Sequence, residues 1–478
     1  MTTTLDQEAS PHPRVLETAM VAPSPAPETT SIPLTFLDVV WLNFSPVGRV
    51  FFYRLSPDTD IAAILSNLKD SLSRALGAFY PLAGRLRPTP GMSGRHELHY
   101  LPGDGVSFSV AELDAEVEEL AADEPREVAR ILPLVPPLSS TEGAVQVLAV
   151  QATVLRGGRG LAVGVAVHHA ACDGASSTRF LHTWAVAANG ARAPPPSPPV
   201  FDRTLVKDPT GLYDMVSEVV SAARPKNGFV KMTDDKLLAT FTLSKEDIQG
   251  VKDVVASVSD GQAPPPRCSS LVATFSFIWS CYQRAKDDES SDGSGQTYFV
   301  LPIDQRSRIK PYPISDEYFG NCIVATMAAP NDQLAAAGAD GLLAACMAVT
   351  LAIERGALGE LGLPEKMMMW MGYAREVAAS GGGLLAVGGS PRFQVYDVDF
   401  GFGRPAKVEL VARSGYMTVA ESRGSGGGIE VGMFLPPASM RRFQNCFHAR
   451  CHYVASSARQ VVPGHKGQMK ATIKVDYD

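Results

Sequence analysis

The sequence predicts an α/β protein of two domains, and three observations support this expectation. The chain has 478 residues, which is too long for one compact core. A short apolar run at 161–167 is typical of a buried strand, and apolar residues at helical spacing follow it at 175–188. A proline-rich stretch at 190–200 is expected to be stiff and extended, which suits a crossover between domains.

The other elements follow from periodicity and turn residues. Residues 1–30 are rich in Thr, Pro, Ser and Ala, and we expect a loose arm that leads into the first strand. The remaining predictions are a helix within 59–86, strands within 94–110, helices at 244–257 and 269–286, a solvated loop at 286–296, strands at 416–422 and 429–435 joined by a glycine-rich turn, and a last helix at 439–458.

Composition and charge narrow the classes of function. Apolar residues make up 45% of the chain and charged residues 19%, as in globular proteins. The net charge of −7 and the lack of a basic stripe disfavour a nucleic-acid partner. No apolar run suits a signal peptide or a membrane span. Seven scattered cysteines fit a reducing compartment, so we expect a cytoplasmic protein.

Two histidines stand where the strand at 161–167 gives way to the next helix, in the segment His-His-Ala-Ala-Cys-Asp-Gly at 168–174. Histidine has an ordinary pKa near 6.5, so His169 can take a proton from an alcohol at neutral pH. Asp173 either faces His169 or turns into the structure. The competing interpretation is that His169 only caps a strand, but the histidine pair followed by Asp-Gly favours chemistry.

Other kinds of site fit the sequence less well. His169 and Asp173 are four residues apart, but the strand pattern argues against a shared helical face, and no third metal ligand follows from spacing. The segment Cys446–His452 carries two cysteines and two histidines, which we interpret as core cysteines and surface histidines of the last helix. We therefore expect no metal. Neither a Gly-x-Ser-x-Gly elbow nor a Walker A motif occurs.

Two distant motifs together resemble the paired signature of the plant BAHD acyltransferases. They are His169-x-x-x-Asp173-Gly174 and the segment Asp-Phe-Gly-Phe-Gly-Arg-Pro at 399–405. The segment Tyr-Phe-Gly-Asn-Cys at 318–322 is similar to a motif of the subgroup that acts on anthocyanins and other phenolic glucosides. Further matches to the family cover nearly the whole chain and lie at 33–38, 51–53, 80–86 and 304–308.

The resemblance implies two chloramphenicol-acetyltransferase-like domains, with mixed sheets flanked by helices and an active-site channel at their interface. The N-terminal domain would span 1–190 and carry the histidine motif. A crossover loop would span 191–220, and the C-terminal domain would span 221–478 with the second motif. The implied co-substrate is acyl-CoA, with malonyl-CoA suggested by the subgroup, and the acceptor is a phenolic glycoside. We expect a monomer with no bound cofactor.

The resemblance also implies roles for single residues. His169 would be the general base that deprotonates the acceptor hydroxyl in a ternary complex. Asp173 would point away from the substrate and pair with Arg306 or Arg308, bracing the histidine segment. Five residues belong to a motif that lies away from the chemistry and organises the inter-domain region: Asp399, Phe400, Gly401, Phe402 and Gly403.

Two positions depart from the family pattern. Phe402 stands where Trp is usual, and Val398 where Thr is frequent. Neither residue can donate a hydrogen bond. If the family uses those donors for its oxyanion, this chain must use a backbone amide or another side chain. Alternatively, the motif is purely structural here.

The sequence offers a few candidates for the residues that bind the acyl-CoA donor. A malonyl carboxylate requires a cation; Arg179 is the candidate, and the alternative is that it is a solvated surface arginine. Lys252, Ser269 and Ser270 fall in regions similar to the family's CoA-contacting elements. The alternative functions are a hydroxycinnamoyl-CoA transferase on the same acceptors, a non-catalytic relative, and a metal-dependent hydrolase.

Overall fold

The computed structural model describes residues 12–190, 197–222, 235–259, 267–287, 296–357, 361–380, 382–411, 417–424 and 426–460. The helices are α1 Phe36–Val39, α2 Ile61–Ala78, α3 Val117–Leu120, α4 Val128–Ile131, α5 Gly174–Ala188, α6 Leu212–Ala222, α7 Lys245–Val258, α8 Ser270–Asp287, α9 Ala339–Ala357, α10 Leu363–Ser380 and α11 Pro437–Gln460.

The strands form three sheets. The first, six-stranded sheet has the order β1 Arg14–Val21, β6 Val106–Leu113, β10 Leu148–Leu155, β11 Gly160–Val167, β3 Val47–Arg54 and β16 Lys407–Val411. The second, seven-stranded sheet has the order β14 Ile323–Ala328, β13 Thr297–Asp304, β15 Gly383–Gly389, β17 Met417–Glu421, β18 Ile429–Leu435, β12 Leu237–Leu243 and β7 Arg126–Glu127. The third, five-stranded sheet has the order β2 Thr30–Pro33, β5 His96–Tyr100, β4 Arg85–Pro88, β9 Ala144–Gln146 and β8 Ser140–Thr141.

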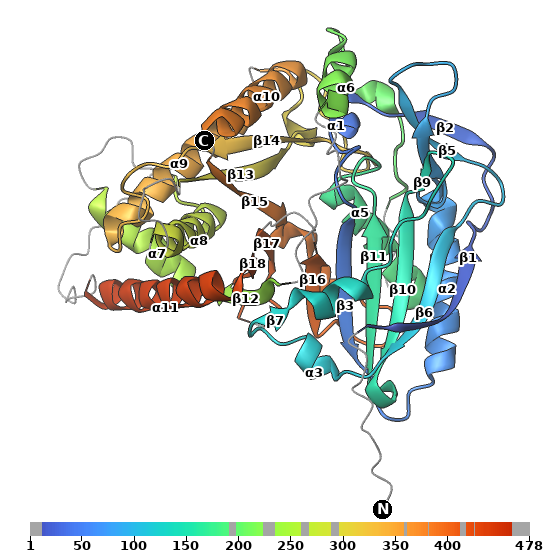
Figure 1. Cartoon of the computed structure of the whole chain (residues 1–478), viewed down its shortest axis with the longest axis horizontal. Coiled ribbons are helices and arrows are strands. Elements are labelled where there is room, and N and C mark those ends of the chain that lie inside the picture. Colours follow the sequence, from blue (N-terminus) through green and yellow to red (C-terminus); the bar gives the residue numbers. More distant parts are fainter. Residues whose placement is uncertain are drawn as a thin grey trace, which may run out of the picture.

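The first two sheets are mixed and helices cover them, as the sequence predicts. Helices α2 and α5 pack on the first sheet, where the Trp184 indole of α5 donates to the Leu68 carbonyl of α2 at 3.2 Å. Helices α7, α8, α9 and α11 gather on the outer side of the second sheet (Figure 1). Each of these two sheets therefore has its own apolar core.

The two larger sheets exchange edge strands. Strand β16 comes late in the chain, yet it pairs with β3 of the first sheet. Strand β7 comes from the first third of the chain, yet it pairs with β12 of the second sheet. Each sheet is thus completed by a strand from beyond the predicted crossover.

Most predicted elements are confirmed. The strand at 161–167 is β11, and all eight of its residues are buried. The predicted helices at 175–188, 244–257, 269–286 and 439–458 correspond to α5, α7, α8 and α11. The seven cysteines all lie within the described residues, and no disulfide links any two of them. The predicted solvated loop lies almost wholly outside the described residues.

Two predictions are wrong in part. Residues 14–21 are not a loose arm but strand β1, which pairs antiparallel with β6. Its apolar residues do not alternate with polar ones, so no strand period reveals it, and most of its side chains are exposed. The crossover is not all loop, because residues 212–222 form α6. Its first amides, those of Leu212 and Tyr213, donate to the Asp208 carboxylate at 2.7 and 2.9 Å.

None of the helices in the described part of the chain combines the length and apolar character needed to cross a membrane.

Candidate active site

His169 lies just beyond the end of β11, where the chain leaves the first sheet. The preceding residue still belongs to the sheet edge, because the His168 amide donates to the Val147 carbonyl at 2.9 Å. Helix α5 begins five residues after His169, with Asp173 as its N-cap. The half-buried His169 is therefore held between a rigid strand and a rigid helix.

The His169 ring is hydrogen-bonded to Asn321, which lies just before β14 and is far from His169 in sequence. Asn321 Oδ1 is 3.1 Å from His169 Nδ1. The Asn321 amide nitrogen donates to Asp38 Oδ1 and to the His169 carbonyl, each at 2.9 Å. Asp38 is fully buried and also accepts from the Asn321 backbone amide at 3.0 Å. The three residues form one connected chain, which we call the Asp38–Asn321–His169 relay.

The relay determines the tautomer of His169. The Asp38 carboxylate and the His169 carbonyl can only accept, so the NH2 group of Asn321 must face them. Its Oδ1 then faces the ring, and His169 Nδ1 must carry the hydrogen. Nε2 is left with a free lone pair, which is what a general base requires.

The pKa values of the two histidines are lowered to different degrees. Burial lowers the pKa of His169 below 6.5, against the opposing effects of a backbone hydrogen bond, the Asp173 carboxylate and Asn321. Burial, with His169 alongside, lowers the pKa of His168 further, to about 4. His168 Nδ1 accepts from the Ala170 amide at 3.2 Å. Both rings are therefore neutral at pH 7, and only His169 remains a usable base.

Trp41, just after α1, stacks on the His169 ring. The two ring centroids are 3.8 Å apart and the planes differ by 12°. Asn321 fixes the ring by one edge, and Trp41 covers one of its faces. The face of an indole also favours a cation, so this stack stabilises the imidazolium that proton transfer would create.

Asp173 points away from His169 and braces the surrounding segments. Its carboxylate is 2.8 Å from Arg306 Nη1, and both side chains are buried. It also accepts from the amides of Ser176 and Cys322, at 2.9 and 3.0 Å. Of the two arginines offered by the sequence, Arg306 makes this ion pair, whereas Arg308 donates to the Asp304 carbonyl.

The segment at 318–322 is tied to the same brace. Arg306 Nη2 donates to the carbonyls of Tyr318 and Gly320 at 3.1 and 3.2 Å. Gly320 also packs so closely on the Arg203 guanidinium that a Cβ there would overlap it. A larger residue at this position would have to displace the buried Arg203, which donates to the Phe319 carbonyl.

The second motif lies at the opposite end of α5. Asp399 Oδ1 accepts from the amides of Gly401 and Gly403, at 2.8 and 2.9 Å. A Cβ on Gly401 would lie 3.6 Å from the carbonyl of Ala188, the last residue of α5. Helix α5 has 15 residues, which at 1.5 Å per residue separates its two ends by roughly 20 Å.

The two departures at this motif therefore do not bear directly on the His169 chemistry. Phe402 packs edge-to-face on Tyr53, with centroids 4.8 Å apart. Val398 is fully buried, and its carbonyl accepts from the Tyr53 hydroxyl at 2.8 Å. Both residues serve packing, so an oxyanion donor must be sought near His169.

The structure brings the candidate CoA-binding residues together at the start of α8. Lys252 Nζ, on α7, donates to Ser270 Oγ at 2.9 Å. Ser269 Oγ accepts from the Val272 amide at 3.2 Å and so caps α8. A cation, exposed hydroxyls and a helix N-terminus together suit a phosphate.

The candidate for the acyl carboxylate already has partners. Arg179 Nη2 donates to the Ser197 carbonyl at 2.8 Å and lies 3.4 Å from Glu317 Oε1. The Cys446–His452 segment lies on α11, where Cys446 is buried and His448 and His452 are exposed. Within the described ranges no group of three or more His, Cys, Asp and Glu is arranged to hold a metal ion.

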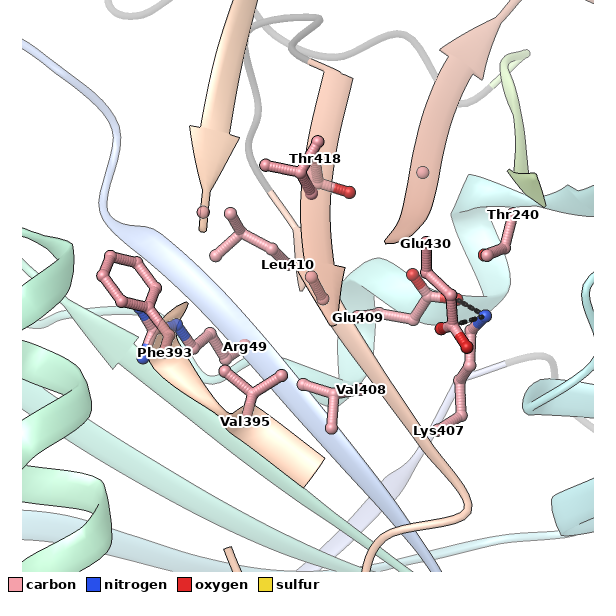
Figure 2. A pocket seen from close by; sticks show the side chains of 14 residues that line it. Arg49, Thr240, Phe393, Val395, Lys407, Val408, Glu409, Leu410, Thr418 and Glu430 are labelled. Carbon is pink, nitrogen blue, oxygen red and sulfur yellow. Dashed lines mark ion pairs between the residues drawn. The ribbon is translucent and has the colours of Figure 1, made fainter. Parts of the chain in front are cut away.

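A cleft lies between the first and second sheets, and we call it the inter-sheet cleft (Figure 2). Arg49 and Phe393 lie at one end, and Lys407, Glu409 and Glu430 form ion pairs at the other. His169 is not among its lining residues. The remaining lining residues are Thr240, Gly389, Val395, Val408, Leu410, Thr418, Val419, Ala420 and Gly432.

Comparison with known proteins identifies the family. A model described as the Transferase family matches residues 14–449. The chain belongs to this family, that of the BAHD acyltransferases. It is 31% identical to a malonyl-coenzyme:anthocyanin 5-O-glucoside-6'''-O-malonyltransferase of Salvia splendens, over 93% of this chain and 97% of the relative. It is 32% identical to phenolic glucoside malonyltransferase 1 of Arabidopsis thaliana, over 93% of this chain and 99% of that relative. The protein is thus a CoA-dependent acyltransferase.

Solved structures share the fold of this BAHD chain. Vinorine synthase matches with a TM-score of 0.68 and 21% identity, over 90% of this chain and 96% of the other. TRI101 of F. graminearum, complexed with ethyl coenzyme A, matches with a TM-score of 0.60 and 15% identity, over 87% and 97%. These likenesses confirm the two-domain, chloramphenicol-acetyltransferase-like architecture.

Three residues of this site received no role from the sequence. Asp38 and Asn321 lie within segments that match the family, and Trp41 follows the first of these. A buried acid in a matched segment is a signal for Asp38. Nothing local reveals that Asn321 reaches His169, because 152 residues separate them.

Proposed function

We propose that this enzyme transfers a malonyl group from malonyl-CoA to a hydroxyl of a phenolic glucoside, such as a flavonoid or anthocyanin glucoside, with His169 as general base. The observation that carries the role of His169 is the relay. It fixes the hydrogen on Nδ1 and leaves Nε2 free at the end of a buried strand.

The reaction is a direct transfer within a ternary complex. Nε2 of His169 takes the proton of the acceptor hydroxyl as its oxygen attacks the thioester carbonyl. The carbon–sulfur bond then breaks, and the CoA thiolate takes the proton back from the imidazolium. Asp38 and Asn321 hold the ring, Trp41 stabilises its charged form, and Asp173 with Arg306 holds the segment in position.

The names of the relatives support the donor and the acceptor. The two malonyltransferases above act on glucosides, and the same holds for a dahlia anthocyanin 3-O-glucoside malonyltransferase with 29% identity. A coumaroyl-CoA transferase from Arabidopsis acts on anthocyanidin 3-O-glucosides and is also 29% identical. The second candidate function is therefore hydroxycinnamoyl transfer to the same acceptors.

The test combines a variant with a donor panel. His169→Ala should lower kcat about 100- to 10,000-fold with malonyl-CoA, because it removes the base. His99→Gln is the control, since His99 lies on β5 in the third sheet. Near-normal turnover of folded His169→Ala would refute the mechanism. Faster transfer from coumaroyl-CoA than from malonyl-CoA by the wild type would favour the second candidate.

A further inference from the structure

Arg49 is a buried cation without a carboxylate partner. It lies on β3, and only 6% of its surface is exposed. Its guanidinium donates to Thr178 Oγ1 at 2.8 Å and to the Gly174 carbonyl at 3.4 Å. Among the described residues no acid pairs with it. Burial lowers the pKa of Arg49 to about 10, so it keeps its charge at neutral pH. An uncompensated buried charge costs free energy.

The position of Arg49 makes this charge harder to explain as a structural feature. Both of its bonds go to the first turns of α5, and Gly174 belongs to the histidine motif itself. The start of a 15-residue helix carries the positive end of the helix dipole. That end repels a cation and attracts an anion. Asp173 already caps this end of α5 and is paired with Arg306, so the charge of Arg49 is the one left to attract a negatively charged ligand.

Arg49 also opens onto the inter-sheet cleft. Arg49 and Phe393 lie side by side at one end of the cleft (Figure 2), with the guanidinium carbon 5.8 Å from the centroid of the phenyl ring. Lys407 at the other end is paired with Glu409 and Glu430. Arg49 is therefore the cation of the cleft lining that has no acid partner among the described residues.

We propose that Arg49 binds the free carboxylate of a dicarboxylic acyl group carried on CoA, first of all a malonyl group. This inference rests on the proposed function of the His169 site. The arginine fork can bind a carboxylate through two parallel hydrogen bonds. Only two of its five N–H donors are used within the described residues. An acetyl group has no charge to place there, and Arg179 already faces Glu317.

The experiment compares two donors with one acceptor. In Arg49→Gln, the ratio of kcat/KM for malonyl-CoA to that for acetyl-CoA should fall about 10- to 100-fold, as expected when hydrogen bonds to a charged group are lost. Arg49→Lys keeps the charge without the planar fork, so its donor ratio should lie between those of the wild type and Arg49→Gln. Arg450→Gln is the matched control, and it should leave the ratio unchanged. Arg450 is buried on α11, and it donates to the Ala336 and Gly338 carbonyls.

Thermal unfolding separates binding from a structural role. Without ligand, the unfolding midpoint of Arg49→Gln should equal or exceed that of the wild type, because an unpaired buried charge is removed. Malonyl-CoA should raise the wild-type midpoint more than acetyl-CoA does, and Arg49→Gln should lose this difference. A wild type in which both donors raise the midpoint equally overturns the inference, whether or not the variant folds.

The remaining outcomes distinguish this inference from the proposed function. Malonyl transfer with an unchanged donor ratio in Arg49→Gln overturns the role of Arg49 and leaves the proposed function standing. If Arg179→Gln selectively loses malonyl transfer while Arg49→Gln keeps the wild-type donor ratio, the role of Arg49 is likewise overturned and the proposed function stands. A wild type that transfers acetyl but no dicarboxylic acyl group contradicts both.

Discussion

At the scale of single residues, Asn321 decides which nitrogen of His169 can act. Its NH2 group donates to two acceptors, and this orientation turns its side-chain oxygen towards His169 Nδ1. The proposed base therefore depends on a fully buried side chain, that of Asn321. Asp38, which is fully buried, holds that amide in place in turn.

Replacing Asn321 by Ala should lower kcat about 100-fold, because the ring loses its fixed orientation and tautomer. The acidic limb of the pH–rate profile lies below pH 6.5 in the wild type, where neutral His169 becomes protonated. The Asn321 bond raises the pKa of His169, so the variant should shift this limb to lower pH. Steady-state kinetics from pH 5 to 8 measure both effects.

Asn67→Ala is the control for this prediction. The Asn67 amide is half-buried and, like that of Asn321, donates to a backbone carbonyl, but to that of Ala188 at the far end of α5, at 3.0 Å. It should change neither kcat nor the pH profile. An Asn321→Ala variant with a wild-type profile would contradict the role of the relay.

At the scale of elements, the junction of α7 with α8 gathers the candidate phosphate ligands. Lys252 comes from the middle of α7, and the two serines stand at the start of α8. The lysine charge and the helix dipole reinforce one another at this point. The junction is exposed, so removing the lysine should affect binding more than folding.

Lys252→Ala should raise KM for acyl-CoA about 10-fold and leave kcat unchanged, because one charge-assisted hydrogen bond to a phosphate is lost. The effect should shrink as ionic strength rises. Lys245→Ala, at the exposed start of the same helix, is the control. An unchanged KM in Lys252→Ala at low salt would remove this residue from the CoA site.

Elements with their own apolar pattern could be predicted from sequence, and pairings between distant elements could not. The residue patterns of β11 and α5 indicate a strand and a helix, so the sequence alone predicts that His169 lies between them. Strand β1 exposes most of its side chains and carries no such pattern. The choice of Arg306 over Arg308 depends on how the turn after β13 orients two neighbouring side chains, which residue type does not reveal.

At the scale of the whole molecule, an ionic cluster joins the two larger sheets. Lys407 Nζ, on β16, lies 2.6 Å from Asp123, 3.7 Å from Glu430 and 3.9 Å from Glu409. Three acids and three bases balance within it: Asp123, Glu409, Glu430, Arg126, Lys407 and Arg423. The cluster spans β16 of the first sheet and β7 and β18 of the second.

Lys407→Met should lower the free energy of unfolding by about 3–5 kcal/mol, because it leaves buried carboxylates without their central cation. Denaturant-induced unfolding measures this loss. The control is Arg14→Met, which breaks an exposed pair with Glu112 and should change stability by less than about 1 kcal/mol. Equal effects of the two substitutions would show that the cluster does not hold the sheets together.

The exchange of edge strands has a consequence for synthesis on the ribosome. Strand β3 is made early, but its partner β16 lies at 407–411. Until most of the chain has been translated, one edge of the first sheet stays unpaired, and an unpaired edge invites association with other chains. The amino-terminal half therefore cannot complete its fold alone. The two halves should assemble when produced together as separate fragments, because each supplies the strand that closes the other.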